Sequence, residues 1–419
     1  MHFNGLRRLG LAVVILGSSL PGAAPALASS DADAVIAWNL NASNAIVGVA
    51  RQPPHSAIFS FAMVQGAVYD AVTAIEGGYE PYLSSPDADG TESTDAAVAT
   101  AAYAVLVTLF PAQQLALDSL YAASLADVPD GTAKEAGIDI GEATASAMIA
   151  DRVGDGRAGP PAIVIGDEPG EWRPTLPLFG TDPASWAGNV RPFLMDSVDQ
   201  FRSDGPNPMA SAAYAEDLNE VKSLGASNSS TRTADQTDAA IFWQDHGVAL
   251  WNRIQRSLAT SHALSGAEAA RLLAGTNLAG ADGAISCWND KVYWNFWRPI
   301  TAIREAGSDG NSATEADGNW TPLFGTPPFP DHPSGHGCVS GAIVHTMQNF
   351  FGTDKIGFTA FSNNSLTTRS FDRLSHALKE IIDCRVWAGI HFRTADVQGA
   401  VIGKKVAHLL DASYLQPMD

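Results

Sequence analysis

Three short segments in the last third of the chain carry residues that could bind and activate a tetrahedral anion. They read Lys291-Val-Tyr-Trp-Asn-Phe-Trp-Arg298-Pro299, Pro333-Ser334-Gly335-His336 and Arg385-Val-Trp-Ala-Gly-Ile-His391. A bound phosphate or vanadate needs fixed donors on several oxygens. Arginine meets two oxygens at once with its planar fork, and lysine adds a compact charge. One of the two imidazoles could attack or coordinate the central atom while the other handles protons, so the ordered triple favours oxyanion chemistry.

The first segment is predicted to be helical. Lys291 and Arg298 are seven residues apart, about two helical turns, so we expect both side chains to project from one face of a helix. Pro299 should then end or kink that helix, because proline lacks a backbone donor and clashes with the preceding turn.

The second segment reads as a loop that enters a helix. A Pro-rich stretch, 326–333, precedes Ser334, and a run of small residues, 337–342, follows His336. This pattern predicts Ser334 as the helix N-cap, with backbone amides aimed at an anion. His336 would then lie in the first turn, beside the anion.

The third segment needs a break in its helix. Arg385 and His391 are six residues apart, which in an unbroken helix places them on different faces. Gly389 lies between them and predicts a helix end or bend that lets both side chains reach one pocket.

Together these segments resemble the three-part signature shared by vanadium-dependent haloperoxidases and the phosphatidic acid phosphatase type 2 superfamily. In that signature a Lys, six residues and Arg-Pro precede Pro-Ser-Gly-His, and then Ser-Arg, five residues and His. The first two parts match completely here, and Cys384 replaces the usual Ser before Arg385. The family's usual Asp, four residues after the last His, is Ala395 in this chain, and Asp396 follows it. This leaves the carboxylate partner of His391 open.

The residues around the motifs are most similar to those of bacterial secreted haloperoxidase-like sequences, over roughly the C-terminal 130 residues. The resemblance implies vanadate as cofactor and assigns the residues that bind its oxygens. The cations would be Lys291, Arg298 and Arg385, and Ser334 and Gly335 would bind the remaining oxygens.

The resemblance also implies roles for both histidines. His391 would be the axial nitrogen ligand to vanadium, and His336 the acid–base that takes the proton of hydrogen peroxide. Trp288 and Phe329 match positions that line the halide side of the haloperoxidase pocket, although apolar packing would explain both equally well. The implied substrates are a halide, hydrogen peroxide and a small organic acceptor.

Two other functions fit some of the same residues. A secreted acid phosphatase would use His391 as the nucleophile of a phosphohistidine and His336 as general acid. The absence of Asp at position 395 and the haloperoxidase-like sequence around the motifs disfavour the phosphatase. A phosphate-binding protein without catalysis would need the cations but would have no use for two histidines.

The N-terminal sequence and the net charge indicate where the protein acts and which partners are unfavourable. Arg7-Arg8, an apolar run 9–20 and the ending Ala26-Leu27-Ala28 predict a secretory signal peptide at residues 1–28, and hence a secreted or periplasmic protein. No other stretch of about 18 uninterrupted apolar residues occurs. The formal net charge is −20, which disfavours binding to nucleic acid or anionic membranes.

Apolar periodicity predicts an all-α helical bundle, in agreement with what the resemblance implies. Helices are expected near 56–76, 93–109, 111–126, 132–153, 207–224, 234–259, 265–297, 337–351, 371–388 and 395–412. Ala162–Ile165 is the only strand candidate. We predict an N-terminal helical region, 29–235, with an ordered Pro/Gly/Trp-rich excursion at 154–206, and a C-terminal bundle, 236–419, that carries the site. A homo-oligomer is compatible with this organisation.

The three cysteines all lie near the motifs. A Cys338–Cys384 disulfide behind the site is one pairing the sequence permits, with Cys287 as a small buried apolar residue. Cys338 should face away from the anion, because it lies two residues past His336 on the expected helix.

Overall fold

The computed structural model describes residues 32–418, and its regular structure is almost entirely helical. This confirms the all-α bundle expected from the sequence. The predicted signal peptide lies outside the described residues. The boundary between the two predicted regions at 235/236 remains a prediction.

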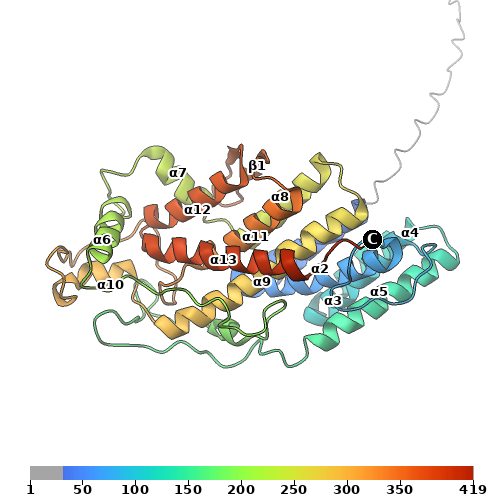
Figure 1. Cartoon of the computed structure of the whole chain (residues 1–419), viewed down its shortest axis with the longest axis horizontal. Coiled ribbons are helices and arrows are strands. Elements are labelled where there is room, and N and C mark those ends of the chain that lie inside the picture. Colours follow the sequence, from blue (N-terminus) through green and yellow to red (C-terminus); the bar gives the residue numbers. More distant parts are fainter. Residues whose placement is uncertain (1–31, 419) are drawn as a thin grey trace, which may run out of the picture.

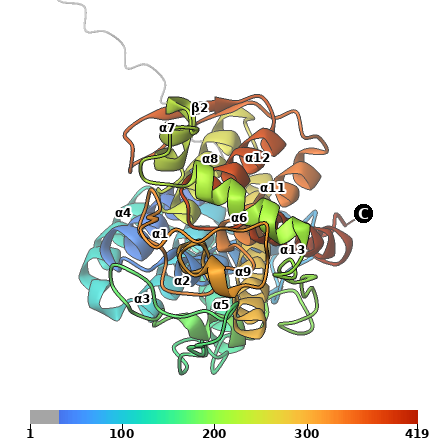
Figure 2. The same ribbon diagram turned by 90° about the vertical axis from the view of Figure 1, so that its left-hand side faces the viewer.

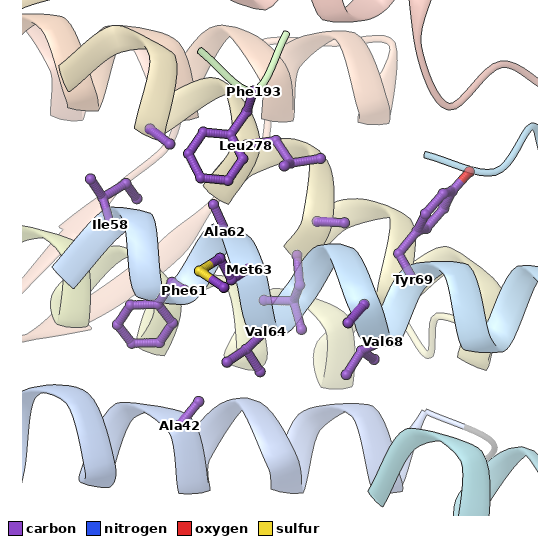
Figure 3. Close-up of a cluster of buried hydrophobic side chains, with 14 of the residues drawn as sticks. Ala42, Ile58, Phe61, Ala62, Met63, Val64, Val68, Tyr69, Phe193 and Leu278 are labelled. Carbon is purple, nitrogen blue, oxygen red and sulfur yellow. The ribbon is translucent and has the colours of Figure 1, made fainter. Parts of the chain in front are cut away.

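The N-terminal region is built around one helix that is apolar on every side. Its helices are α1 (Asp33–Ser43), α2 (Pro54–Glu76), α3 (Thr94–Leu109), α4 (Gln114–Ala126) and α5 (Thr132–Asp151). Helix α2 is long and apolar enough to cross a membrane, but 89% of the relevant window is buried inside the protein. Figure 3 shows its side chains, Ile58 and Phe61 among them, pointing in several directions toward neighbouring elements that include Ala42 of α1. A helix that is apolar all round belongs in a core.

The C-terminal half contains the longer and more regular bundle. Its helices are α6 (Ala212–Leu224), α7 (Ala234–Phe242), α8 (Gly247–Ser261), α9 (Gly266–Trp294), α10 (Pro299–Arg304), α11 (Gly335–Phe351), α12 (Leu374–Trp387) and α13 (Arg393–Ser413). A short antiparallel hairpin joins β1 (Phe358–Phe361) to β2 (Thr368–Phe371). The strand expected at Ala162–Ile165 is absent, since that segment is irregular and half-exposed or exposed, without a partner strand to pair its backbone.

Several predicted helix boundaries differ from the structure, and two of the differences have a clear local cause. The single helix expected over 234–259 is two helices, because His246 caps α8 by accepting a hydrogen bond from the Ala249 amide at 3.3 Å. The helix expected to reach 297 ends at Trp294, where Asn295 adopts a left-handed conformation. Asparagine tolerates this conformation better than most residues, so it stops the helix before Arg298.

Small residues bring α11 and α13 into close contact. A Cβ added at Gly337 would lie 2.5 Å from the Asp396 carbonyl oxygen, and one added at Gly341 would lie 2.9 Å from Ala400. The helix carrying His336 therefore packs backbone to backbone against the helix that follows His391. This packing fixes the relative positions of the second and third motifs.

The 154–206 excursion contains little regular structure, and its place in the predicted domain organisation remains a prediction. It runs irregularly along the lower side of the molecule in Figure 1, from α5 toward α10. The buried carboxylate of Asp282 on α9 accepts hydrogen bonds from the backbone amides of Phe193, Leu194 and Met195 at 2.7–2.8 Å. The excursion is thereby tied to the same helix that carries Lys291. Helices α6 and α10 lie at the end of the molecule that faces the viewer in Figure 2.

Candidate active site

The three motifs meet beside one cavity of about 480 Å³. Gly335, His336, Arg385 and His391 line it directly, whereas the side chains of Lys291, Arg298 and Ser334 are fully buried. We call the set Lys291, Arg298, Ser334, Arg385 and His391 the cation wall. The structure thus brings together every residue that the sequence assigned to the anion.

Lys291 reaches this site from the last turn of α9. Its ammonium group donates to the carbonyl oxygens of Pro330 and Asp331, at 2.8 and 3.1 Å, and to that of Pro333. An ammonium has three donors, so Lys291 fastens the Pro-rich loop and contributes its charge to the site from behind. The pKa of Lys291 is lowered to about 8, chiefly by burial, with the charge of Arg298 contributing to the same shift.

Arg298 does not share a helix with Lys291. Its backbone is extended, and it lies at the N-cap position of α10, where Pro299 begins the helix. The expected common helical face is therefore wrong, although both side chains reach the site. Arg298 donates to the carbonyl oxygens of Phe329 at 2.7 Å and Ile390 at 2.6 Å, and its Nη2 has no partner. Burial lowers its pKa to about 10.

Arg385 and Ser334 hold the other unpartnered donors. Ser334 occupies the N-cap position of α11, as predicted, but its hydroxyl makes no capping bond. Its Oγ is buried without a hydrogen-bond partner, as are Nε and Nη1 of Arg385. Helix α12 ends at Trp387, and Gly389 has φ +77°, so the predicted helix end between Arg385 and His391 is present.

Close packing explains the glycine of the second motif. A Cβ at Gly335 would lie 2.9 Å from the indole ring of Trp288. Only glycine therefore fits between the start of α11 and this ring without a shift. The N-terminus of α11 is left open toward the cavity.

These buried donors fit a tetrahedral oxyanion. Buried polar groups are nearly always hydrogen-bonded, and a buried unpaired cation is costly. Here donors on Arg298, Ser334 and Arg385 lack partners within the described part of the chain, and Arg385 lines the cavity directly. An anion carrying several oxygens would satisfy them, so the residues present fit phosphate or vanadate.

Asp331 is the carboxylate partner of His391 that the sequence left open. Its Oδ1 lies 2.9 Å from Nδ1 of His391, and both side chains are buried. This contact assigns the proton to Nδ1 and leaves the lone pair on Nε2, which lies 3.1 Å from Nη1 of Arg298. Burial raises the pKa of Asp331 to about 7 despite the opposing charges of Arg298 and Lys291. Burial lowers the pKa of His391 well below its usual value, and the nearby cations lower it further.

His336 lies in the first turn of α11, as predicted, and its half-buried side chain lines the cavity. Its pKa is well below the ordinary value, because burial disfavours the charged form and Arg385 adds repulsion. A hydrogen bond to the Trp243 backbone opposes this shift. His336 is therefore neutral near pH 7, with an imidazole that can accept a proton.

Sequence reasoning missed a second polar pair in this cavity. His55 Nε2 lies 3.2 Å from Oδ2 of Asp182, and the same oxygen accepts from Trp288 Nε1 at 3.1 Å. The imidazole of His55 stacks on Trp288 with 4.4 Å between ring centroids, and Phe329 lies 5.3 Å from Trp288. No local spacing could have revealed the pair, since His55 begins α2 and Asp182 lies in the irregular excursion. We call Pro53, Pro54, His55 and Asp182 the N-terminal wall.

The three cysteines are buried and free, so the Cys338–Cys384 disulfide is not formed. Cys338 packs behind α11, where its sulfur would lie 3.3 Å from a Cβ added at Gly399, and it faces away from the cavity, as expected. Burial raises the pKa of the Cys384 thiol, which keeps it protonated beside Arg385.

Comparisons with known proteins agree with this geometry. Residues 271–418 match the family model of the VCPO second helical-bundle domain. The vanadium chloroperoxidase of Curvularia inaequalis is 27% identical over 202 residues, which cover 42% of this chain. The match spans about a third (32%) of the length of that relative.

Two solved structures share the fold over nearly the whole chain. A bacterial vanadium-dependent iodoperoxidase has a TM-score of 0.79 at 25% identity, covering 92% of this chain and 97% of its own. A bacterial vanadium-dependent chloroperoxidase has a TM-score of 0.70 at 16% identity, covering 89% of this chain and 95% of its own. The segment matched by the family model includes the whole cation wall and excludes the N-terminal wall.

Proposed function

We propose that this chain, which belongs with the vanadium haloperoxidases in family and fold, is a vanadate-dependent haloperoxidase that oxidises halide with hydrogen peroxide. The observation that carries the proposal is the set of buried, unpartnered donors on Arg298, Ser334 and Arg385 beside the Nε2 lone pair of His391. A phosphate-binding protein would need the cations but not two neutral histidines in one cavity. The predicted leader at 1–28 would export the enzyme.

Each residue of the cation wall would have a separate task. Arg298, Arg385, Ser334 and the Gly335 amide would hold the oxygens of vanadate, while Lys291 supplies charge and fixes the Pro-rich loop. His391 would hold the metal through Nε2, with Asp331 keeping the proton on Nδ1. When bound, vanadate would activate hydrogen peroxide toward attack by halide.

His336 would move the proton. Its imidazole is neutral near pH 7, so it can accept the proton that hydrogen peroxide loses and return it to the leaving oxygen. Trp288 and Phe329 would shape the halide side. Their rings lie 5.7 and 5.0 Å from the Lys291 ammonium, an arrangement that keeps this side apolar but close to positive charge.

A secreted acid phosphatase is the second candidate, and one observation strengthens it. The absence of a carboxylate at 395 argued against phosphatase chemistry, but Asp331 pairs with His391 in its place. A phosphohistidine nucleophile would thus have an orienting partner. The haloperoxidase relatives outweigh this point, and we expect any phosphatase turnover to be weak.

A paired assay separates the two functions. One sample receives vanadate, hydrogen peroxide and iodide or bromide, and a vanadate-free sample receives p-nitrophenyl phosphate. We expect vanadate to switch on halide oxidation and to inhibit any phosphate-ester hydrolysis in the same preparation. Robust hydrolysis, with no halide oxidation at saturating vanadate and peroxide, would establish the phosphatase instead.

A further inference from the structure

The cavity is larger and more varied than vanadate and a halide require. Its 480 Å³ lies in the range of small-molecule sites, which are mostly apolar with a few placed polar groups. Four prolines, Trp288 and Phe329 supply the apolar lining near the motifs. His55 and Asp182 supply polar atoms there that the proposed oxidation of halide does not use.

Asp182 is held rigidly in place. Its carboxylate accepts from the Ala184 amide at 2.9 Å and from Trp288 Nε1, and its own amide donates to the Pro328 carbonyl oxygen. Burial alone would raise the pKa of Asp182, but contact with His55 and these donors outweighs it, and the pKa is lowered. The carboxylate is therefore charged, and Nε2 of His55 faces it at 3.2 Å.

This arrangement turns His55 Nδ1 away from Asp182. Nδ1 makes no hydrogen bond to another residue within 32–418, and His55 is one of the residues that line the cavity. Stacking on Trp288 at 4.4 Å, with the planes 20° apart, fixes the orientation of the imidazole ring. The cavity thus presents an oriented ring nitrogen beside flat aromatic and proline surfaces.

We propose that this part of the cavity binds a hydroxylated aromatic acceptor, whose hydroxyl group donates to His55 Nδ1 while its ring packs against Trp288 and the flanking prolines. The proposal rests on the proposed haloperoxidase function and names the substrate class that the same cavity would halogenate. His55 acts as a positioning residue, with Asp182 fixing the orientation of its ring.

The chemistry balances without a further reagent. Hypohalous acid formed at the His336 side of the cavity meets the ring before it can leave. A ring carbon bonds to the halogen and the oxygen–halogen bond breaks. The ring then loses its proton, and that proton leaves with the hydroxide as water.

Binding can be measured without turnover. Calorimetry of the purified full chain, with phenol and with anisole, compares a ring that can donate a hydrogen bond with one that cannot. One hydrogen bond contributes about 1 kcal/mol, so phenol should bind roughly fivefold more tightly than anisole. His55→Phe should remove this preference, His55→Gln should restore part of it through its amide oxygen, and exposed His376→Gln should keep it.

Product analysis gives a second measurement. During turnover with phenol, the ortho-to-para ratio should differ from that of hypohalous acid in free solution, and His55→Phe should move it to the solution value. The KM for phenol should rise about fivefold more than the KM for the halide.

The outcomes separate the two proposals. Equal binding of phenol and anisole by the wild type, or an unchanged preference in folded His55→Phe and His55→Gln proteins, overturns the acceptor site. A wild type that prefers phenol but oxidises no halide leaves the binding site standing and removes the haloperoxidase function.

Discussion

The cation wall and the N-terminal wall of one cavity differ in how far their polar atoms are already paired. On the cation wall, donors of Arg298, Ser334 and Arg385 are buried without partners. On the N-terminal wall, the carboxylate of Asp182 accepts from the Ala184 amide and from Trp288 Nε1, and His55 Nε2 lies 3.2 Å from it without a formed hydrogen bond. An incomplete set of donors needs a ligand to complete it, whereas a paired set is finished before any ligand arrives.

The two walls also come from different parts of the chain. All residues of the cation wall lie within 271–418, the part of the chain matched by the family model. The N-terminal wall comes from the start of α2 and from the irregular excursion, outside that match. This division is what we expect if the first wall holds the shared cofactor and the second selects a substrate particular to this protein.

The largest effect should come from His391. His391→Ala should abolish retention of vanadium through gel filtration, because electrostatic capture by cations alone lacks the coordinate bond. His336→Ala is the matched comparison, since it also removes a neutral imidazole from the cavity. That variant should keep vanadium and lose about 10²–10⁴-fold in halide oxidation, the range typical of a general acid–base.

Metal analysis and initial rates check both expectations. Stoichiometric vanadium in His391→Ala would contradict the ligand assignment. Turnover near the wild-type rate in vanadium-loaded His336→Ala would show that another group handles the proton.

Local sequence was sufficient to predict most helices and to single out three motifs that meet beside one cavity. The Pro-rich approach and small-residue run predicted the start of α11, and Gly389 predicted the end of α12, because both depend on residues close in the chain. The shared helix for Lys291 and Arg298 was wrong, since Asn295 in a left-handed conformation ends α9 first. The periodicity of apolar residues alone does not predict a left-handed residue that ends a helix.

Pairs between distant residues could not be predicted. Asp331 and His391 are 60 residues apart and meet only because α13 packs on α11 and carries the preceding loop with it. The contact between His55 and Asp182 depends on an irregular segment whose path has no periodic signature. Both pairs are set by tertiary packing, and they determine how each imidazole is oriented.

A smaller effect is expected at Arg385, where one substitution should raise folding stability and weaken anion binding. Its guanidinium is buried, two of its nitrogens have no partner, and it forms no ion pair with any described carboxylate. Arg385→Met keeps the apolar stem and removes a buried charge that the neighbouring Asp396 offsets only in part, so the free energy of unfolding of the anion-free protein should rise by about 1 kcal/mol. Vanadate and phosphate binding should weaken at the same time.

Denaturant unfolding with and without phosphate measures both quantities. Arg373→Met, at an arginine on the surface, should change stability by less than about 0.5 kcal/mol. A destabilised Arg385→Met protein would mean that the guanidinium is already satisfied without an anion. The contrast between the two walls would then be lost.

The smallest effect concerns the pH dependence of anion binding through Lys291, whose pKa burial lowers to about 8. A bound anion favours the protonated ammonium and raises its pKa, so affinity is full below about pH 8 and falls as pH rises through that value. Sulfate keeps a constant charge in this range. His336 and His391 have pKa values well below their usual one, and Arg298 stays charged to about 10. Asp331, with a pKa of about 7, loses its remaining proton over the same range and adds a smaller part of the loss. Sulfate affinity, measured by calorimetry, should therefore weaken about tenfold from pH 7 to pH 9. Lys291→Arg should flatten this dependence, and exposed Lys355→Met should leave it intact. A full tenfold loss that persists in Lys291→Arg would assign the titration to another group. Lys291 would then be a residue whose hydrogen bonds are already satisfied and that does not contribute to anion binding.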